Sequence, residues 1–287
     1  MPGSTNACVA TSDGTNLFVR DWGGGQPIVF VASWSMPSDS WAYPMLALSE
    51  RGFRCVAFDR RGHGRSDDPG GGYDFDTLAD DIAAVMAAGD LRDVTMVGHS
   101  VGCAEIVHYL DRHGSDRVAR IALVSPTTPA LSASEHNPAG VEPEVFDQVR
   151  KLQFARDFPQ WIEDNLRPFA SADTSAAMLD WVRGMALGAS LQAVVHLNRT
   201  LTAADLTGAL GRIDVPTLVI HGDRDVSCPI ELTGRRTAEL VPDGHLAVYE
   251  GAPHGLFVSH HERLSADLAA FALGRPWRDV QNGESGK

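Results

Sequence analysis

Short apolar runs alternate with longer segments of helical spacing along most of the chain. Residues 27–31 and 54–58 are two such runs, rich in residues that favour strands. Strands that are apolar on both faces belong in a sheet covered on both sides, and such strands run parallel. Residues 41–50, between the two runs, have helical spacing and end at Arg51-Gly52, which is typical of a helix C-terminus. The three segments predict a β-α-β unit.

The same alternation continues further along the chain. It predicts helices at residues 77–88, with Asp76 as N-cap, and 104–113, and strands at 94–97 and 121–124. Four more strands are expected: two in a hairpin within residues 9–20 that turns at Ser12-Asp13-Gly14, and one each at residues 216–220 and 247–249.

This order of elements predicts an α/β fold with a doubly wound, mostly parallel eight-stranded sheet. The strand pattern stops within residues 126–211, where a lead-in that contains several prolines is followed by helical segments rich in Phe, Trp and Leu. We therefore expect a core domain of residues 1–125 and 212–275, with a helical cap at 126–211 inserted after the sixth strand. The polar residues 276–287 are expected to form a flexible tail.

Composition limits the class of partner. Of the 287 residues, 44% are hydrophobic and 21% charged, as in an ordinary globular protein. The formal net charge of −13 and the absence of Lys and Arg clusters argue against nucleic acid and membranes as partners. A small molecule is the expected partner, and apolar cap surface could support a homo-oligomer.

The cysteines and the N-terminus bear on location. Cys8, Cys55, Cys103 and Cys228 lie far apart without a CxxC pair, so we interpret them as free thiols. Residues 1–10 lack the basic start and apolar run of a signal peptide, and no apolar stretch reaches the roughly 20 residues that span a bilayer. The sequence predicts a cytoplasmic protein without metal or cofactor.

A G-x-S-x-G motif at residues 98–102 is the strongest chemical signal. It lies directly after a predicted strand and before a predicted helix, which favours a nucleophilic Ser100 over a merely structural glycine-flanked turn. Glycines two residues before and after the serine allow the sharp turn that exposes its hydroxyl.

A serine hydroxyl needs a base, and the base needs an orienting acid. In chain order the acid comes after a late strand and the histidine after the last, which selects His254 in the loop 251–255. The competing histidines lie too early in the chain (His63, His221) or within a helical stretch (His260, His261).

Two carboxylates follow the strand that ends near residue 221. Asp225 is favoured as the acid because it lies further into the loop, where it can reach the histidine. Asp223 is the alternative, and is otherwise expected to cap the turn or pair with Arg224.

The developing negative charge on a substrate needs backbone N–H donors. One should come from Val101, after the nucleophile, and the other from the loop 32–35, where Trp34 is the candidate. The Trp34 ring could equally pack against the cap, which does not exclude its backbone role. An apolar pocket above Ser100 would suit an aryl or medium-length acyl ester, and its candidate residues are Ser33, His99, Phe146, Phe154, Phe158, Trp181, Met185 and Val226.

At these residues the sequence resembles the α/β-hydrolase family, and within it the bacterial aryl esterases also called cofactor-free haloperoxidases or perhydrolases. The likeness spans nearly the whole chain. It implies the α/β-hydrolase fold, a triad of Ser100, Asp225 and His254, and oxyanion donors at Trp34 and Val101. The segments that carry it are residues 21–23, 57–67, 98–102, 214–223 and 251–255.

The chain departs from that branch at two places. Ala32-Ser33 stands where relatives carry His-Gly, and Ser33 would resist a φ that glycine permits, so the loop is expected either to be held differently or to be strained. Cys103 stands where a further glycine is usual; we interpret it as helix packing, with a reactive thiol as the alternative.

Three functions are compatible with this pattern. The leading hypothesis is hydrolysis of a carboxylic ester or lactone through an acyl-enzyme, with perhydrolysis as a side reaction. The alternatives are a specialised lactonase, cyclase or carbon–carbon hydrolase, and a small-molecule-binding homologue of low turnover. A serine at the elbow excludes dehalogenases and epoxide hydrolases of this fold, which need a carboxylate there.

Overall fold

A central sheet of eight strands, in the order β1-β2-β4-β3-β5-β6-β7-β8, organises residues 7–275, which the computed structural model describes. β1 and β2 are antiparallel to their neighbours, and all other neighbouring strands pair in parallel. The predicted doubly wound, eight-stranded sheet is confirmed. The strands are β1 (Ala7–Ala10), β2 (Asn16–Gly23), β3 (Pro27–Val31), β4 (Arg54–Phe58), β5 (Val94–His99), β6 (Val118–Val124), β7 (Thr217–Gly222) and β8 (Gly244–Tyr249).

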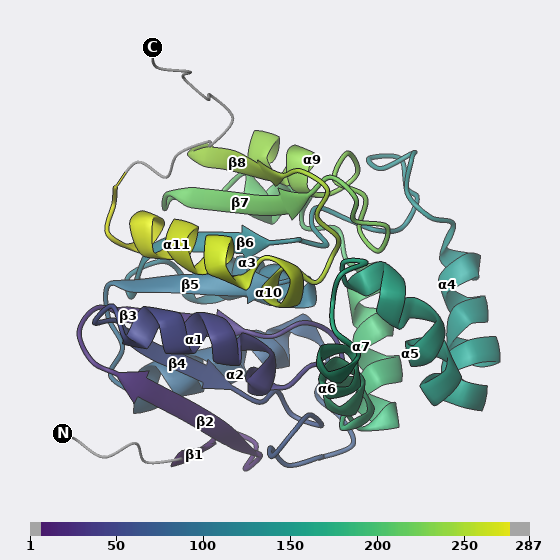
Figure 1. Ribbon diagram of the computed structural model, residues 1–287, viewed down its shortest axis with the longest axis horizontal. Helices are drawn as coiled ribbons and strands as arrows, with labels where there is room; N and C mark the ends of the chain where they lie inside the picture. The colour runs from purple at the N-terminus through teal and green to yellow at the C-terminus, as the bar shows by residue number, and fades with distance from the viewer. Residues whose placement is uncertain (1–6, 276–287) are drawn as a thin grey trace.

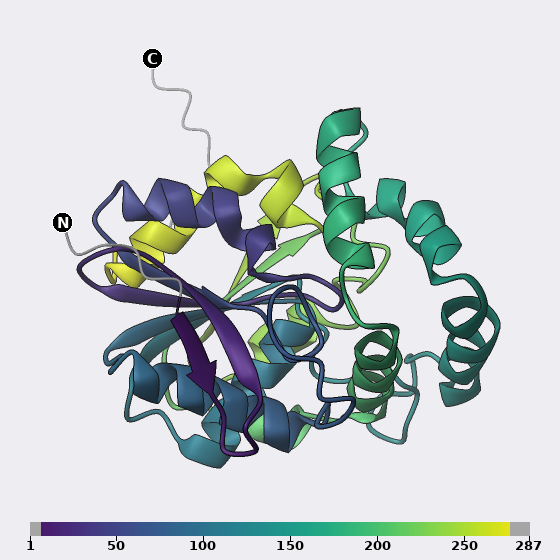
Figure 2. The same cartoon turned by 90° about the horizontal axis from the view of Figure 1, so that it is seen from below.

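Helices cover both faces of the sheet (Figures 1 and 2). One face carries the 3₁₀ turn η1 (Ser38–Trp41), α1 (Ala42–Ser49), α10 (Leu256–Ser259) and α11 (His261–Ala272), and the other carries α2 (Phe75–Ala88), α3 (Val101–His113) and α9 (Gly234–Leu240). Apolar side chains therefore form two separate buried clusters, one on each side of the sheet. This explains why β3 is apolar along its length and why β4 is apolar after Arg54.

The remaining helices follow β6, and four of them, α4, α5, α6 and α7, gather beyond one end of the sheet, at the right of Figure 1. The full set is α4 (Pro143–Val149), the π-helical turn η2 (Arg150–Phe154), α5 (Ala155–Phe169), α6 (Ala176–Leu187), α7 (Leu191–Ala203) and α8 (Thr207–Leu210). These helices lie within the predicted cap, although the division into domains stays a prediction. The expected flexible tail at 276–287 lies outside the described residues, as do residues 1–6.

Two helix starts differ from the prediction. Asp74, not Asp76, caps α2, because its carboxylate accepts a hydrogen bond from the backbone N–H of Thr77 at 2.9 Å. Asp76 lies inside the first turn, where its carboxylate meets His108. α3 begins at Val101, three residues earlier than predicted, since the helix follows the elbow serine without a gap.

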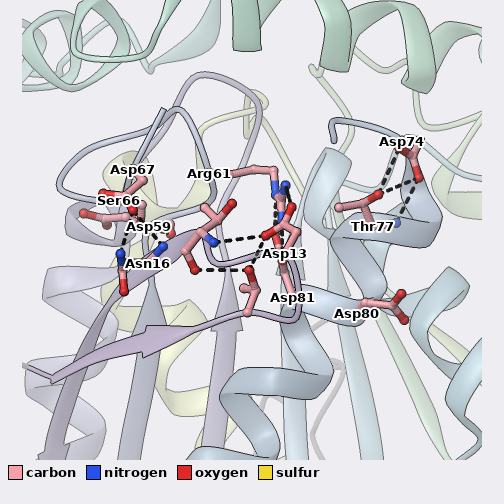
Figure 3. A network of polar contacts seen from close by, with 12 residues as sticks. Asp13, Asn16, Asp59, Arg61, Ser66, Asp67, Asp74, Thr77, Asp80 and Asp81 are labelled. Atoms are coloured by element: carbon pink, nitrogen blue, oxygen red, sulfur yellow. Dashed lines mark hydrogen bonds and ion pairs between the residues drawn. The ribbon is translucent and has the colours of Figure 1, made fainter. Parts of the chain in front are cut away.

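A buried arginine ties the N-terminal hairpin to the sheet domain (Figure 3). Arg61, 1% exposed, donates to both carboxylate oxygens of Asp81 at 2.7 Å and to Asp13 at 2.8 Å. The hydrogen bond from Arg61 holds the pKa of Asp13 well below its usual range. This network gives the 57–67 segment a structural role.

Among the described residues, no helix is both long and apolar enough to cross a bilayer.

Candidate active site

Ser100 lies between β5 and α3 in a strained backbone conformation. Its φ of 57° and ψ of −117° are rarely adopted by residues other than glycine. A Cβ at Gly98 would lie 2.7 Å from the backbone nitrogen of Cys103, and one at Gly102 would lie 2.4 Å from the carbonyl oxygen of Val31. Only glycine fits these two positions, which explains the motif, and the N-terminus of α3 points its positive end at the serine.

His254 contacts the carboxylate of Asp225 directly. Its Nδ1 lies 2.6 Å from Asp225 Oδ2, and both residues are buried. The other oxygen, Oδ1, accepts from the backbone N–H groups of Ser227 and Cys228 at 2.9 and 2.8 Å. Because an ionised carboxylate only accepts hydrogen bonds, Nδ1 of His254 carries a proton, and in the neutral imidazole Nε2 then keeps its lone pair. The geometry leaves Nε2 free to act as a base.

The alternative acid, Asp223, lies elsewhere in the same loop. Its exposed carboxylate accepts from the backbone N–H of Gly251 at 2.7 Å and makes no contact with His254. Asp223 therefore holds the start of the loop 251–255 that carries His254, whereas Asp225 contacts His254 itself.

A second histidine, His221, also contacts Asp225. His221 is fully buried at the end of β7, and its Nε2 lies 3.0 Å from Asp225 Oδ2 and 2.9 Å from the carbonyl oxygen of Cys228. Both neighbours are acceptors, so Nε2 carries the proton. The sequence presents His221 only as a competing base, whereas in the structure it is a donor that fixes the acid.

These contacts perturb the titration of the acid. Burial alone raises the pKa of Asp225, but the nearby His254 and the hydrogen bonds from His221 and His254 outweigh it and hold the pKa well below its usual range. A carboxyl with a lowered pKa binds fewer protons when folded. Its contribution to stability is therefore complete above the unfolded pKa of about 4 and is lost as the pH falls.

Acid should consequently destabilise the parent more steeply than Asp225→Asn. Below about pH 4, the free energy of unfolding should fall faster with decreasing pH in the parent, by up to about 1.4 kcal/mol per pH unit. Urea denaturation of both proteins at pH 5, 4 and 3 measures the difference. Equal slopes would show that the Asp225 carboxyl is not ionised in the way the hydrogen bonds require.

A cavity of about 480 Å³ opens beside Ser100 and His254. Its walls come from the loop after β3, from cap helices and from the loop that follows Asp225. The predicted pocket residues found in the lining are Ser33, Phe146, Phe154 and Val226.

Four residues predicted for the pocket lie elsewhere. His99 sits behind the histidine loop, where its Nε2 lies 3.0 Å from the carbonyl oxygen of His254, and burial lowers its pKa to about 3. Phe158 is buried against Trp34 and Trp161. Met185 is buried in the same apolar cluster as Phe158, on the α1 and α11 face of the sheet. Trp181 packs on Tyr43 instead. Helical spacing alone did not reveal which face of each cap helix is turned to the cavity.

The loop after β3 is held by a buried ion pair that the sequence analysis missed. Arg60, 2% exposed, donates to the carbonyl oxygens of Ala32 and Ser33 at 2.7 and 3.2 Å, and lies 2.6 Å from the Glu105 carboxylate. The residue with positive φ is Ser35, at 57°, and not Ser33. Of the two alternatives for this loop, strain at Ser33 is therefore wrong, because the loop turns two residues later.

The Trp34 side chain packs against the helices of the cap. Its indole N–H donates to the carbonyl of Val194 at 2.9 Å, and its ring packs on Phe154, Phe158 and Trp161. Within the described residues, no acceptor is bonded to the backbone N–H of Trp34, while that of Val101 opens α3. Both amides thus stay candidates for the oxyanion hole, a role that remains a prediction.

Removing the Arg60 side chain should cost much stability. Arg60→Met would leave Glu105 and two carbonyl groups buried without their cation, and we expect a loss of about 3–5 kcal/mol in the free energy of unfolding. Arg60→Met combined with Glu105→Leu should recover part of it, because the unpaired carboxyl is then gone. Urea midpoints test this, and a loss below about 0.5 kcal/mol in the single variant would contradict it.

Cys103 is fully buried, and its thiol donates to the carbonyl of Val124 at 3.4 Å. Burial raises the pKa of this thiol well above its usual value, which keeps it protonated. The contacts favour the packing interpretation over a reactive thiol.

A strained serine at a strand-to-helix turn lines the same cavity as a histidine bonded to a buried carboxylate, on a doubly wound sheet, and this is the arrangement found in α/β hydrolases. The alpha/beta hydrolase fold family matches residues 26–261, so this chain belongs to that family. The family resemblance inferred from the sequence is confirmed.

Two proteins and one solved structure are examples of what this chain is similar to within the family. A non-heme chloroperoxidase from Streptomyces lividans is 41% identical over 274 residues, covering 92% of this chain and 98% of its own. A bifunctional esterase/perhydrolase from Acinetobacter calcoaceticus is 38% identical over 274 residues, with 92% and 98% covered. The structure of an esterase from Exiguobacterium antarcticum matches with a TM-score of 0.90 at 28% identity, covering 94% of this chain and 100% of its own.

Proposed function

We propose that this protein is a serine hydrolase that cleaves a small-molecule carboxylic ester or lactone through an acyl-enzyme. The observation that carries the proposal is the 2.6 Å contact between His254 and Asp225 beside a cavity that Ser100 and His254 both line. The similarity of this chain to an esterase/perhydrolase and to an esterase structure supports the same reaction class.

In this mechanism the Ser100 hydroxyl attacks the ester carbonyl carbon while Nε2 of His254 takes its proton. The resulting oxyanion accepts hydrogen bonds from the backbone N–H groups of Trp34 and Val101. The leaving alkoxide takes the proton from His254 as the carbon–oxygen bond breaks. A water molecule, deprotonated by the same imidazole, then attacks the acyl-enzyme and releases the acid and Ser100.

Perhydrolysis is a second candidate, favoured by the relative that is named an esterase/perhydrolase. Hydrogen peroxide would replace water in the second step, giving a peracid in place of the acid. No further residue is needed. Cytoplasmic location and a homo-oligomeric state stay predictions.

Labelling with a fluorophosphonate tests the acyl-enzyme directly. We expect one phosphonyl group per chain, located on Ser100 by peptide mass spectrometry, and turnover of p-nitrophenyl esters from acetate to octanoate. Adding hydrogen peroxide to the same assays and trapping peracid measures perhydrolysis. A chain that neither labels nor turns over any of these esters would favour a specialised hydrolase or a binding protein instead.

A further inference from the structure

One polar side chain in the cavity wall is held in a defined orientation. Asn198, on α7, lines the cavity, and its Oδ1 lies 2.8 Å from Nη1 of Arg150. A guanidinium only donates hydrogen bonds, so the amide oxygen must be the atom facing Arg150. The amide nitrogen of Asn198 is then directed away from Arg150, and no acceptor within the described residues is bonded to it.

The arginine behind Asn198 is itself fixed on several sides. Arg150 is 7% exposed, donates to Thr202 Oγ1 at 3.0 Å, and forms an ion pair with Asp147. It opens the π-helical turn η2, whose last residue, Phe154, lines the same cavity. π-helical turns are rare and often occur at functional sites. A buried cation and an unusual turn together pre-orient one amide.

Most of the remaining cavity wall in the cap is apolar. The other asparagine of the cap wall, Asn165, has one N–H of its amide engaged by the carbonyl of Trp161 at 2.8 Å, whereas neither amide N–H of Asn198 is bonded within the described residues. Asn198 thus supplies a pre-oriented N–H donor in a mainly apolar wall, formed by Phe146, Val149, Phe154, Ile162, Leu166 and Val182 among others.

We propose that Asn198 is a specificity-determining residue, and that the substrate carries a second oxygen acceptor, such as a ketone, on its acyl chain. This inference rests on the proposed ester or lactone hydrolysis and names its substrate class. A neutral hydrogen bond in a largely apolar cavity gives a preference of about tenfold over the chain without the acceptor.

Matched acyl chains measure this preference. The value of kcat/KM is determined for p-nitrophenyl heptanoate and for its 4-oxo, 5-oxo and 6-oxo analogues, which differ only by one ketone. The parent is expected to prefer at least one oxo ester by about tenfold. In Asn198→Leu, which is similar in size, that ratio should fall to about 1. Asn165→Leu makes the same change without removing the pre-oriented donor, and should keep the ratio.

A second variant protects the test from misfolding. Asn198→Asp can keep its contact with Arg150 but turns an acceptor toward the cavity, so the oxo preference should disappear or reverse. Absence of any oxo preference in the parent, or an unchanged ratio in both Asn198 variants, would overturn the assignment. Turnover of the plain heptanoate separates the two hypotheses: its presence without an oxo preference rejects only this inference, whereas no turnover of any ester rejects the proposed function and the inference with it.

Discussion

Replacing Ser100 with alanine is expected to lower kcat for p-nitrophenyl acetate about a millionfold and to abolish fluorophosphonate labelling. The hydroxyl is the atom that forms the acyl-enzyme, and within the elbow no other nucleophile can replace it, because the Cys103 thiol is buried and protonated. Any residual rate should come from the oxyanion donors and from substrate binding, which do not depend on the hydroxyl. Stopped-flow and long-time assays of the same preparation cover this range.

Ser227→Ala is the matched control for that variant. Ser227 lines the same cavity, but its contact with Asp225 is made by the backbone N–H, which alanine retains. Ser227→Ala should therefore still label with fluorophosphonate. If Ser100→Ala labels like the parent, the nucleophile lies elsewhere and the acyl-enzyme proposal fails at its first step.

Local sequence signals predicted the sheet and the elbow well. β3 and β4 begin and end where the predicted runs do, because a strand covered on both faces is apolar along its buried length. Arg54, at the start of β4, is only half-buried and pairs with Asp21. The elbow could be recognised because Gly98 and Gly102 are required locally: a Cβ at either position would clash with nearby backbone atoms. Signals within a few residues of one another were enough for these features.

The cap was harder to predict from helical spacing. The π-helical turn η2 lies between α4 and α5, and a non-helical Asp157, with φ −154° and ψ 72°, lies inside α5, so the helical period is interrupted twice. Side chains beyond the interruption point in directions that a constant 3.6-residue repeat does not predict. Phe154, before Asp157, lines the cavity, whereas Phe158, after it, does not.

Two supporting contacts had no signal in the local sequence. Arg60 reaches carbonyl groups more than 25 residues earlier in the chain, and Glu105 lies on another element. His221 meets Asp225 only because the loop after β7 folds back on the strand end. Once the fold is known, supporting residues of this kind can be recognised because their polar side chains are buried, and a buried charge must have a partner.

Asp225→Asn should lower kcat about ten-thousandfold while leaving the fold intact at neutral pH. The two backbone N–H groups that donate to Oδ1, those of Ser227 and Cys228, fix how an asparagine would sit. They need an acceptor, so the amide oxygen would take that position and the NH₂ group would face His254. A donor facing Nδ1 stabilises the imidazole tautomer with its proton on Nε2, which removes the lone pair that must accept the serine proton.

Asp223→Asn provides the matched comparison, because it makes the same change in the same loop. An asparagine there can still accept from the backbone N–H of Gly251, so kcat should change less than tenfold. Initial rates on p-nitrophenyl acetate for both variants, with circular dichroism to verify folding, decide between the two carboxylates. A large loss in Asp223→Asn together with a small one in Asp225→Asn would make Asp223 the functional acid, and the 2.6 Å contact of His254 would then be structural only.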